Sequence, residues 1–122
     1  MKFLLIMQMN RDVWESMPEA ERTEVVTGHG DFMKMITESG ELISTHALAD
    51  PANSNVVRSL DGVMSVKPGP YQETKNYMGG YYLVDCESTE RAVELASQIP
   101  DARVDGLAVE VRPVMFSSGS DM

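Results

Sequence analysis

The chain has 122 residues, of which 43% are hydrophobic and 24% are charged, and ten basic side chains stand against nineteen acidic ones for a formal charge of −9. This length and composition are typical of one globular domain with its own core, not of a disordered or fibrous protein. No apolar run approaches the roughly 18 residues of a membrane span, and a negatively charged protein repels a phosphate backbone. We therefore expect a soluble protein that binds neither a membrane nor nucleic acid.

Cys86 is the only cysteine, which excludes a disulfide or a thiolate metal cluster within one chain. This is typical of a protein in the reducing cytoplasm, which is the location we expect. The apolar residues 3–7 imitate a secretory signal, but they are fewer than the roughly 7 to 15 of such a signal, and polar residues follow them. We interpret residues 2–9 as the first strand, with apolar side chains on both faces.

A long helix is predicted from Ser16 to the pair Ser39-Gly40. Ser16 and Glu19 form a capping-box pattern, and glutamates in the first turns suit the positive end of a helix. Ser39-Gly40 is typical of a left-handed cap at the other end. The apolar stripe that faces the core has spacings of three and four residues and consists of Val25, Val26, His29, Phe32, Met33 and Ile36.

A strand and a hairpin are predicted next. Residues 41–48 have the composition of a strand and residues 49–55 that of a loop. Asp61-Gly62 between the runs 56–60 and 63–66 is a strong signal for a tight hairpin. We expect the pairing to end before residues 67–70, because two prolines in that stretch remove backbone donors.

The last part of the chain predicts a strand at 77–84, a helix at 88–99 that Pro100 stops, and a strand at 107–112. The helix has an inward face made of Ala92, Val93, Leu95, Ala96 and Ile99. We expect a single domain over residues 1–116 and a frayed tail at 117–122.

This order of elements predicts an α+β fold, a ferredoxin-like split βαβ arrangement with an antiparallel sheet. Right-handed crossovers place both helices on the same face of that sheet. Because the first strand is apolar on both faces, leaving the other face in water would expose an apolar patch on the order of several hundred Å², which monomers rarely tolerate. We therefore predict a homodimer joined sheet to sheet.

His29 is the strongest candidate for chemistry. It lies on the apolar stripe of its helix, and an imidazole changes its charge near neutral pH, which suits a general base. Gly28 and Gly30 flank it, and each glycine within a helix costs about 0.5 to 1 kcal/mol relative to alanine, which indicates that space or close backbone approach is needed there. The alternative is a core histidine bonded to one backbone carbonyl, with glycines that only break the helix.

Other chemistries have weaker signals. His46 is the only other histidine and shares no metal-ligand spacing with His29, so we expect no bound metal. The sequence contains no Gly-x-Gly-x-x-Gly or phosphate-loop pattern, so we expect no cofactor. We interpret Cys86, which lies between a strand and a helix, as structural.

Basic side chains gather in one segment of this acidic chain. Arg58, Lys67 and Lys75 lie close together in sequence and would hold a carboxylate or phenolate ligand, with Tyr71 beside them. Salt bridges to nearby carboxylates are the alternative for the basic residues, and strand packing or dimer contacts are the alternative for the tyrosine. We take Arg58, Lys75 and Tyr71 as candidate ligand-binding residues.

Several short motifs are spread over nearly the whole chain. They are Gly69-Pro70-Tyr71-Gln72-Glu73-Thr74-Lys75, Gly79-Gly80-Tyr81-Tyr82-Leu83-Val84, Glu94-Leu95-Ala96, Ile99-Pro100 and Glu110-Val111-Arg112-Pro113-Val114. With these motifs the chain resembles the YCII-related proteins of the DGPF subgroup. The subgroup's Asp-Gly-Pro-Phe motif, usually continued by Glu-Thr-Lys-Glu, has Pro68 here in place of Asp, Tyr71 in place of Phe and Asn76 in place of the last Glu.

The resemblance implies a dimeric α/β barrel and an active site centred on a histidine of the first helix with an acidic partner. His29 matches that histidine. Glu73 is the first candidate for the partner because it lies in the motif loop, and Asp61 and Asp31 are the alternatives. The resemblance also implies relatives that act on small halogenated or hydroxylated ring compounds, and others associated with extracytoplasmic-function sigma factors.

Together these observations predict a protein that binds a small anionic or cyclic molecule between the helices and the sheet. His29 would move a proton, as in an isomerisation or elimination, Glu73 would orient it, and Arg58 and Lys75 would hold negative charge. The alternative is a non-catalytic regulatory or protein-interaction module, linked to extracytoplasmic-function sigma factors, in which His29 is structural. A ligand sensor without chemistry would have the pocket but no acidic partner.

Overall fold

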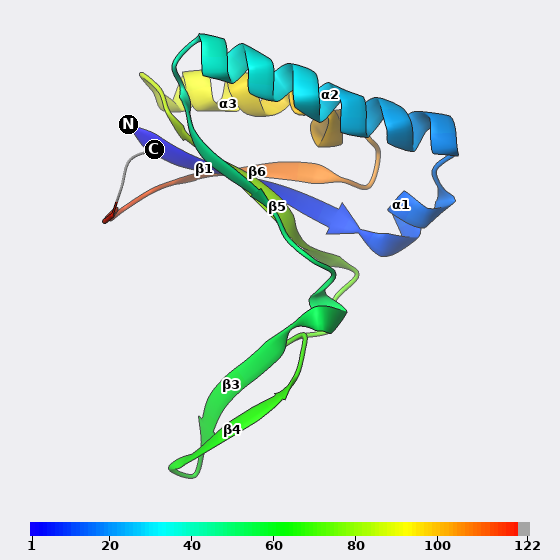
Figure 1. The fold of residues 1–122 in the computed structure, drawn as a ribbon, viewed down its shortest axis with the longest axis vertical. Coiled ribbons are helices and arrows are strands. Elements are labelled where there is room, and N and C mark those ends of the chain that lie inside the picture. The colour runs from blue at the N-terminus through cyan, green and yellow to red at the C-terminus, as the bar shows by residue number, and fades with distance from the viewer. Residues whose placement is uncertain (120–122) are drawn as a thin grey trace.

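The computed structural model describes residues 1–119, in which an antiparallel sheet of four strands carries the long helices on one face (Figure 1). The strands lie in the order β2-β5-β1-β6. Their bounds are Lys2–Asn10 for β1, Leu42–Ala47 for β2, Asn76–Asp85 for β5 and Ala108–Pro113 for β6. This α+β arrangement is consistent with the predicted ferredoxin-like fold. The dimer and the barrel stay predictions.

The core lies between the sheet and the helices α2 (Glu19–Glu38) and α3 (Thr89–Ser97). Phe3 and Leu5 of β1 pack there with Ile36 and Leu95, and all four side chains are fully buried. Burying each such side chain stabilises the fold by about 1.5 to 3 kcal/mol. The alternation along β1 gives the sheet a second apolar face, opposite the helices.

A short helix, α1 (Arg11–Ser16), precedes the long one and was not predicted. Asn10 caps it by accepting a hydrogen bond of 3.1 Å from the backbone N–H of Val13. Ser16 ends α1, and α2 begins after Pro18 without a side-chain cap. The predicted capping box was therefore wrong, because a residue before proline is held extended and breaks the helix at that point.

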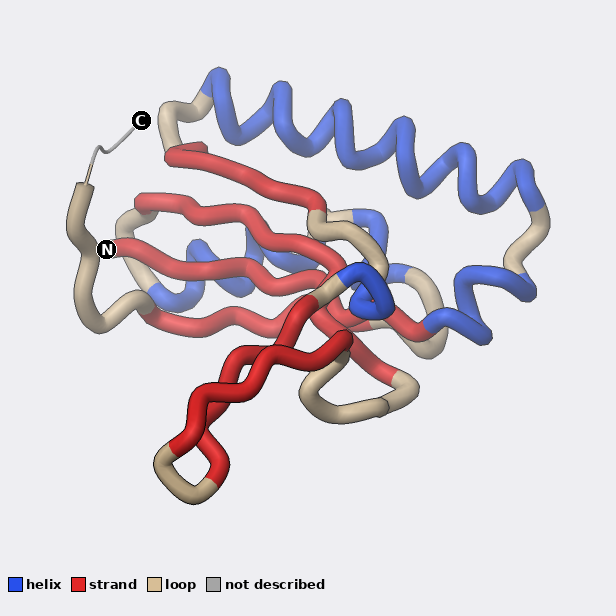
Figure 2. Tube along the Cα trace, turned by 60° about the horizontal axis from the view of Figure 1, so that its bottom comes forward, coloured by secondary structure: helices blue, strands red, loops and turns tan. Residues whose placement is uncertain are grey.

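The hairpin of β3 (Asn55–Leu60) and β4 (Val63–Pro68) stands away from the sheet (Figures 1 and 2). Asp61 and Gly62, with φ of 52° and 79°, form its turn as predicted. Pairing continues to Pro68, beyond the predicted end. Proline is tolerated there because it lies at the end of an edge strand. A 3-10 turn, η1 (Pro51–Asn53), leads into the hairpin.

Helix α3 ends at Ser97, two residues before the predicted end, and Pro100 begins the 3-10 turn η2 (Pro100–Arg103). Val93 is 53% exposed, so its predicted inward position was wrong. The predicted frayed tail at 117–122 lies partly outside the described residues. None of the helices within residues 1–119 is both long and apolar enough to cross a membrane.

Arg91 ties α3 to the start of β2 through Glu41. Its Nε lies 2.9 Å from Glu41 Oε2, and a second guanidinium nitrogen lies 2.8 Å from Oε1. The hydrogen bond from Arg91 lowers the pKa of the Glu41 carboxyl. Because the pKa is lowered in the folded state, the pair stabilises the fold above the ordinary value of the carboxyl, and this contribution is lost as the pH falls.

We expect Glu41→Gln to lower the free energy of unfolding by about 1 to 3 kcal/mol at pH 7, because a hydrogen bond between charged groups is lost. The same variant should show a shallower loss of stability between about pH 5 and 3. Urea unfolding at several pH values measures both effects. Glu94→Gln removes the exposed partner of the same arginine and should change little. Equal acid sensitivity in wild type and Glu41→Gln would contradict this role of the pair.

Candidate functional site

His29, on α2, is bonded at both ring nitrogens. Its Nδ1 lies 2.6 Å from the hydroxyl oxygen of Tyr82 on β5, and its Nε2 lies 2.6 Å from Oδ1 of Asp101 on η2. The rings of His29 and Tyr82 are nearly parallel, with an interplanar angle of 10°. A helix, a strand and a turn far apart in the sequence therefore meet at one imidazole.

With a neutral imidazole, the chemistry of these groups fits one arrangement of protons. Asp101 is the only buried charged residue within residues 1–119, and an ionised carboxylate only accepts hydrogen bonds. Burial, together with the Asp101 carboxylate, raises the pKa of Tyr82 to about 12, so the phenol keeps its proton. Nε2–H of His29 therefore donates to Asp101, and the Tyr82 hydroxyl donates to Nδ1.

The close approach of η2 to α2 depends on Gly28. A Cβ at this position would lie 2.6 Å from Cγ of Pro100, the residue before Asp101. A Cβ at Gly30 would face open space. Beside His29, a close approach is thus found at Gly28, where the neighbour is a proline side chain, and none is found at Gly30.

The His29 network borders a cavity of about 540 Å³ between α2 and one end of the sheet. This volume is within the range of small-molecule sites. Most of the lining is apolar, and none of the described lining residues is lysine or arginine. The apolar wall includes Met7, Met9, Trp14, Val26, Met33 and Leu48. The cavity therefore suits a compact molecule with a large apolar part.

His46 lines the same cavity from β2, which its distance from His29 in the sequence did not indicate. Its ring is tilted against that of Tyr81, with 5.3 Å between the centroids. The pairing of β2 with β5 sets His46 against Tyr81, whose side chain points to the opposite face of the sheet from that of Tyr82. The alternation of side chains along a strand does not predict this contact, because the contact depends on which strands lie side by side in the sheet.

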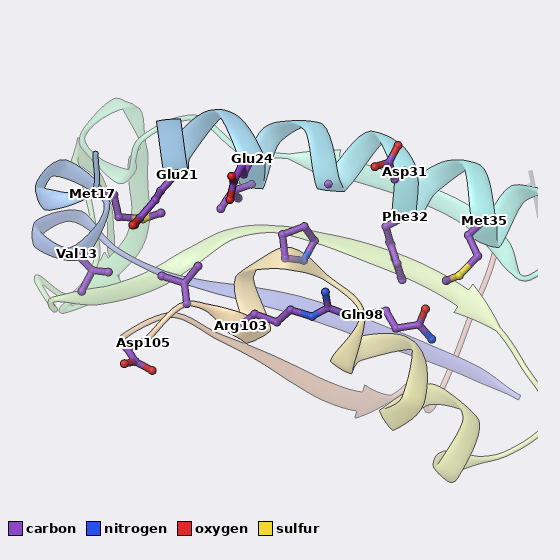
Figure 3. A pocket seen from close by; sticks show the side chains of 14 residues that line it. Val13, Met17, Glu21, Glu24, Asp31, Phe32, Met35, Gln98, Arg103 and Asp105 are labelled. Atoms are coloured by element: carbon purple, nitrogen blue, oxygen red, sulfur yellow. The ribbon is translucent and has the colours of Figure 1, made fainter. Parts of the chain in front are cut away.

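The carboxylate bonded to His29 is that of Asp101, which sequence reasoning did not find. Glu73, the first candidate, is exposed and lines a different cavity. Of the alternatives, Asp61 lies in the hairpin turn, and Asp31 lines the largest cavity, whose residues do not include His29 (Figure 3). Asp101 is 72 positions from His29, and no local pattern marks the contact.

The predicted ligand-binding residues also lie away from His29. Lys75 and Glu73 line a cavity of about 520 Å³ next to the base of the hairpin. Arg58 lies on the exposed strand β3, with its guanidinium carbon 5.7 Å from the centroid of the Tyr71 ring. The structure brings Arg58 and Tyr71 together, and Lys75 and Glu73 together, but neither pair lines the His29 cavity.

The largest cavity has a volume of about 790 Å³ and lies between α2 and the segment of η2 (Figure 3). Its lining includes Glu21 and Glu24 of α2, and Arg103 and Asp105 from the other side. His29, Tyr82 and Asp101 are not among its lining residues. We therefore place the candidate site in the smaller cavity, which holds the hydrogen-bonded network.

Within residues 1–119, no group of three His, Cys, Asp or Glu side chains is arranged to hold a metal ion. Cys86 is buried, and burial raises the pKa of its thiol, which disfavours the reactive thiolate.

The environment of Tyr82 predicts an alkaline titration. We expect one of the four tyrosines to ionise at about pH 12, and we expect this late step to be absent in Tyr82→Phe and present in Tyr81→Phe. Since the folded-state pKa is raised, the contribution to stability is complete below about pH 10 and is lost as the pH rises toward 12. Ultraviolet absorbance of the phenolate measures the step. A late step that persists in Tyr82→Phe would contradict the assignment.

Comparisons with known proteins match nearly the whole chain. The family model of the YCII-related domain matches residues 1–116. The chain is also similar to the uncharacterized protein R00369 of Rhizobium meliloti (strain 1021), with 25% identity over 114 residues. This match covers 93% of the present chain and 92% of that protein.

Proposed function

The chain belongs to the YCII-related family, and we propose that it binds a small cyclic molecule beside His29 and moves a proton on it. The observation that carries this proposal is an imidazole whose Nε2 lies 2.6 Å from a buried carboxylate at the wall of a cavity of about 540 Å³. A base that is oriented by a carboxylate is the usual arrangement for general acid–base catalysis. A core histidine bonded only to a backbone carbonyl, which was the structural alternative, would not have this carboxylate partner.

Asp101 has two effects in this proposal. As an ionised acceptor it holds His29 with Nε2 protonated, so the other nitrogen is the one that accepts a proton. It then stabilises the imidazolium that forms, at the wall of a cavity whose lining is mostly apolar. A proton can thus be taken from a carbon next to a carbonyl group and returned elsewhere, as in an isomerisation, or a leaving group can depart, as in an elimination.

The lining of the cavity favours a cyclic ligand over an anionic one. Among the described residues, no lysine or arginine lines it, so a full negative charge would have no cationic partner there. Uncharged cyclic ketones and enones fit this lining. We keep an anion-binding role for Lys75 only as a proposal for the cavity next to the base of the hairpin, where Arg11 is also present.

The test is a thermal-shift screen of cyclohexanone, cyclohex-2-enone and aromatic and unsaturated acids. A ligand present at 100 times its dissociation constant stabilises by about 2.7 kcal/mol, which is readily detected. Proton NMR in D₂O then measures deuterium uptake by the two ketones. We expect catalysed uptake with wild type and with Glu94→Gln, an exposed position outside the cavity, and none with His29→Gln, whose melting temperature should stay within a few degrees. Equal uptake with His29→Gln would contradict the proposal.

We also propose that the chain is a homodimer of the DGPF subgroup and works in the cytoplasm. The hairpin supports the dimer, because its side chains Val57, Met64 and Val66 are each more than 60% exposed. A two-stranded hairpin without further packing is only marginally stable, so a second copy would stabilise it. Leu4 and Leu83, paired on the face of the sheet opposite the helices, supply a second apolar surface.

Sedimentation velocity tests the dimer, with Val57→Lys and Val66→Lys together as the disrupting change and the exposed Val93→Lys as the control. The expected result is a dimer for wild type and for the control, and a monomer for the double variant. The same hairpin would serve the alternative function, a non-catalytic module for a protein partner. A monomeric wild type that retains deuterium uptake would favour a hairpin that contacts another protein.

A further inference from the structure

Both ring nitrogens of His29 already have protein partners, so the ring offers no open position to the proton of a ligand. A proton therefore reaches or leaves the imidazole through a group that is bonded to it. Within the described chain these groups are the hydroxyl of Tyr82 and the carboxylate of Asp101, and both residues line the cavity.

The direction of the hydrogen bonds distinguishes the two groups. Asp101 accepts the hydrogen bond from Nε2–H of His29 and so holds the imidazole in one tautomer. It is the last group in this series of hydrogen bonds. Tyr82 donates its own proton to Nδ1, and its oxygen keeps a lone pair that can accept a second proton. Proton transfer onto Nδ1, the accepting nitrogen, therefore passes through Tyr82.

We propose that Tyr82 is the catalytic residue that exchanges the proton with the ligand, while His29 acts behind it as the base and Asp101 orients His29. This inference rests on the function proposed above. The ligand's C–H or O–H bond breaks, its proton bonds to the Tyr82 oxygen, and the proton that Tyr82 carried bonds to Nδ1. The ligand keeps the electron pair as an enolate or alkoxide, and the imidazolium is paired with the Asp101 carboxylate. The reverse transfer returns a proton, so no co-reactant is needed.

The surroundings of Tyr82 suit a group that relays protons without holding charge. Its side chain is 2% exposed, and Phe32 packs edge-on against its ring with 4.9 Å between the centroids. Burial and the nearby Asp101 carboxylate disfavour a phenolate, and they raise the pKa of Tyr82 to about 12. Tyr82 is neutral before and after the relay, and the positive charge resides on His29, whose partner is an anion.

Labelling with diethyl pyrocarbonate tests the arrangement without a substrate, because this small reagent acylates an imidazole nitrogen that is neither protonated nor bonded. Peptide mass mapping separates His29 from the exposed His46, which is the internal reference. We expect His29 in wild type to react at least tenfold more slowly than His46. In Tyr82→Phe, which keeps the buried ring, the rate at His29 should rise at least tenfold, whereas Tyr81→Phe should leave it unchanged. Equal reaction of both histidines in wild type, or no rise in Tyr82→Phe, would overturn the proposal.

Deuterium uptake by cyclohexanone and cyclohex-2-enone tests the relay itself. Tyr82→Phe should lower kcat at least 100-fold and leave KM within threefold, and Tyr81→Phe should change neither. Wild-type uptake by Tyr82→Phe would overturn the relay and leave His29 as the direct base. Absence of uptake in wild type would overturn the proposed function and the relay with it. The two failures are thus distinguishable.

Discussion

Asp101→Ala is expected to lower the free energy of unfolding by about 2 to 3 kcal/mol and to abolish deuterium uptake. The substitution removes the one buried carboxylate of the described chain and leaves Nε2–H of His29 without its partner. An unpaired buried donor costs about 1 to 3 kcal/mol, and losing one member of a buried pair costs more than its net contribution suggests. Urea unfolding and the NMR uptake assay measure the two effects.

Two further variants separate structure from chemistry at this position. Asp105→Ala changes an exposed carboxylate in the same segment and should alter neither measurement. Asp101→Asn keeps an oxygen that can accept from Nε2–H but removes the charge that stabilises the imidazolium. It should retain most of the stability and lose about 10²- to 10⁴-fold in rate. If Asp101→Asn were as active as wild type, the carboxylate would be structural only.

Gly28→Ala and Gly30→Ala are expected to change stability in opposite directions. Both replacements gain about 0.5 to 1 kcal/mol of helix propensity. At Gly30 the new Cβ meets open space, so the variant should be more stable by that amount. At Gly28 it would lie 2.6 Å from Cγ of Pro100, and overpacking of this kind costs about 1 to 3 kcal/mol. Urea unfolding of the two variants measures the difference.

The same two variants also test whether the close approach at Gly28 positions Asp101. Relief of the contact at Gly28 requires η2 to move away from α2, which carries Asp101 away from His29. Gly28→Ala should therefore slow deuterium uptake, and Gly30→Ala should not. Stabilisation by Gly28→Ala with full activity would show that the close approach does not position Asp101.

Local patterns predicted the fold well. The apolar alternation of β1, the turn at Asp61-Gly62 and the stop at Pro100 each follow from the chemistry of a few neighbouring residues. The start of α2 was wrong because Pro18 and the cap at Asn10 compete with the capping-box pattern, and a short pattern does not show which one prevails.

Of the candidate site, the sequence predicted only the position of His29. His29 lies on a periodic apolar stripe, so its place beside the core follows from the helix period. Asp101 and Tyr82 reach it through contacts over 72 and 53 positions, which depend on how η2 and β5 pack against α2. The choice of Glu73 came from its place in a motif loop, and that loop folds against the base of the hairpin. Gly28 was the one local residue that signalled the close approach.

A long-range proton–nitrogen correlation spectrum of the histidine-labelled chain, recorded at alkaline pH, tests the arrangement around His29 most directly. The structure predicts that His29 carries its proton on Nε2, that Nδ1 is bare and accepts a hydrogen bond, and that Asp101→Ala ends this preference. A proton on Nδ1 in wild type, or fast averaging between the two tautomers, would contradict the account.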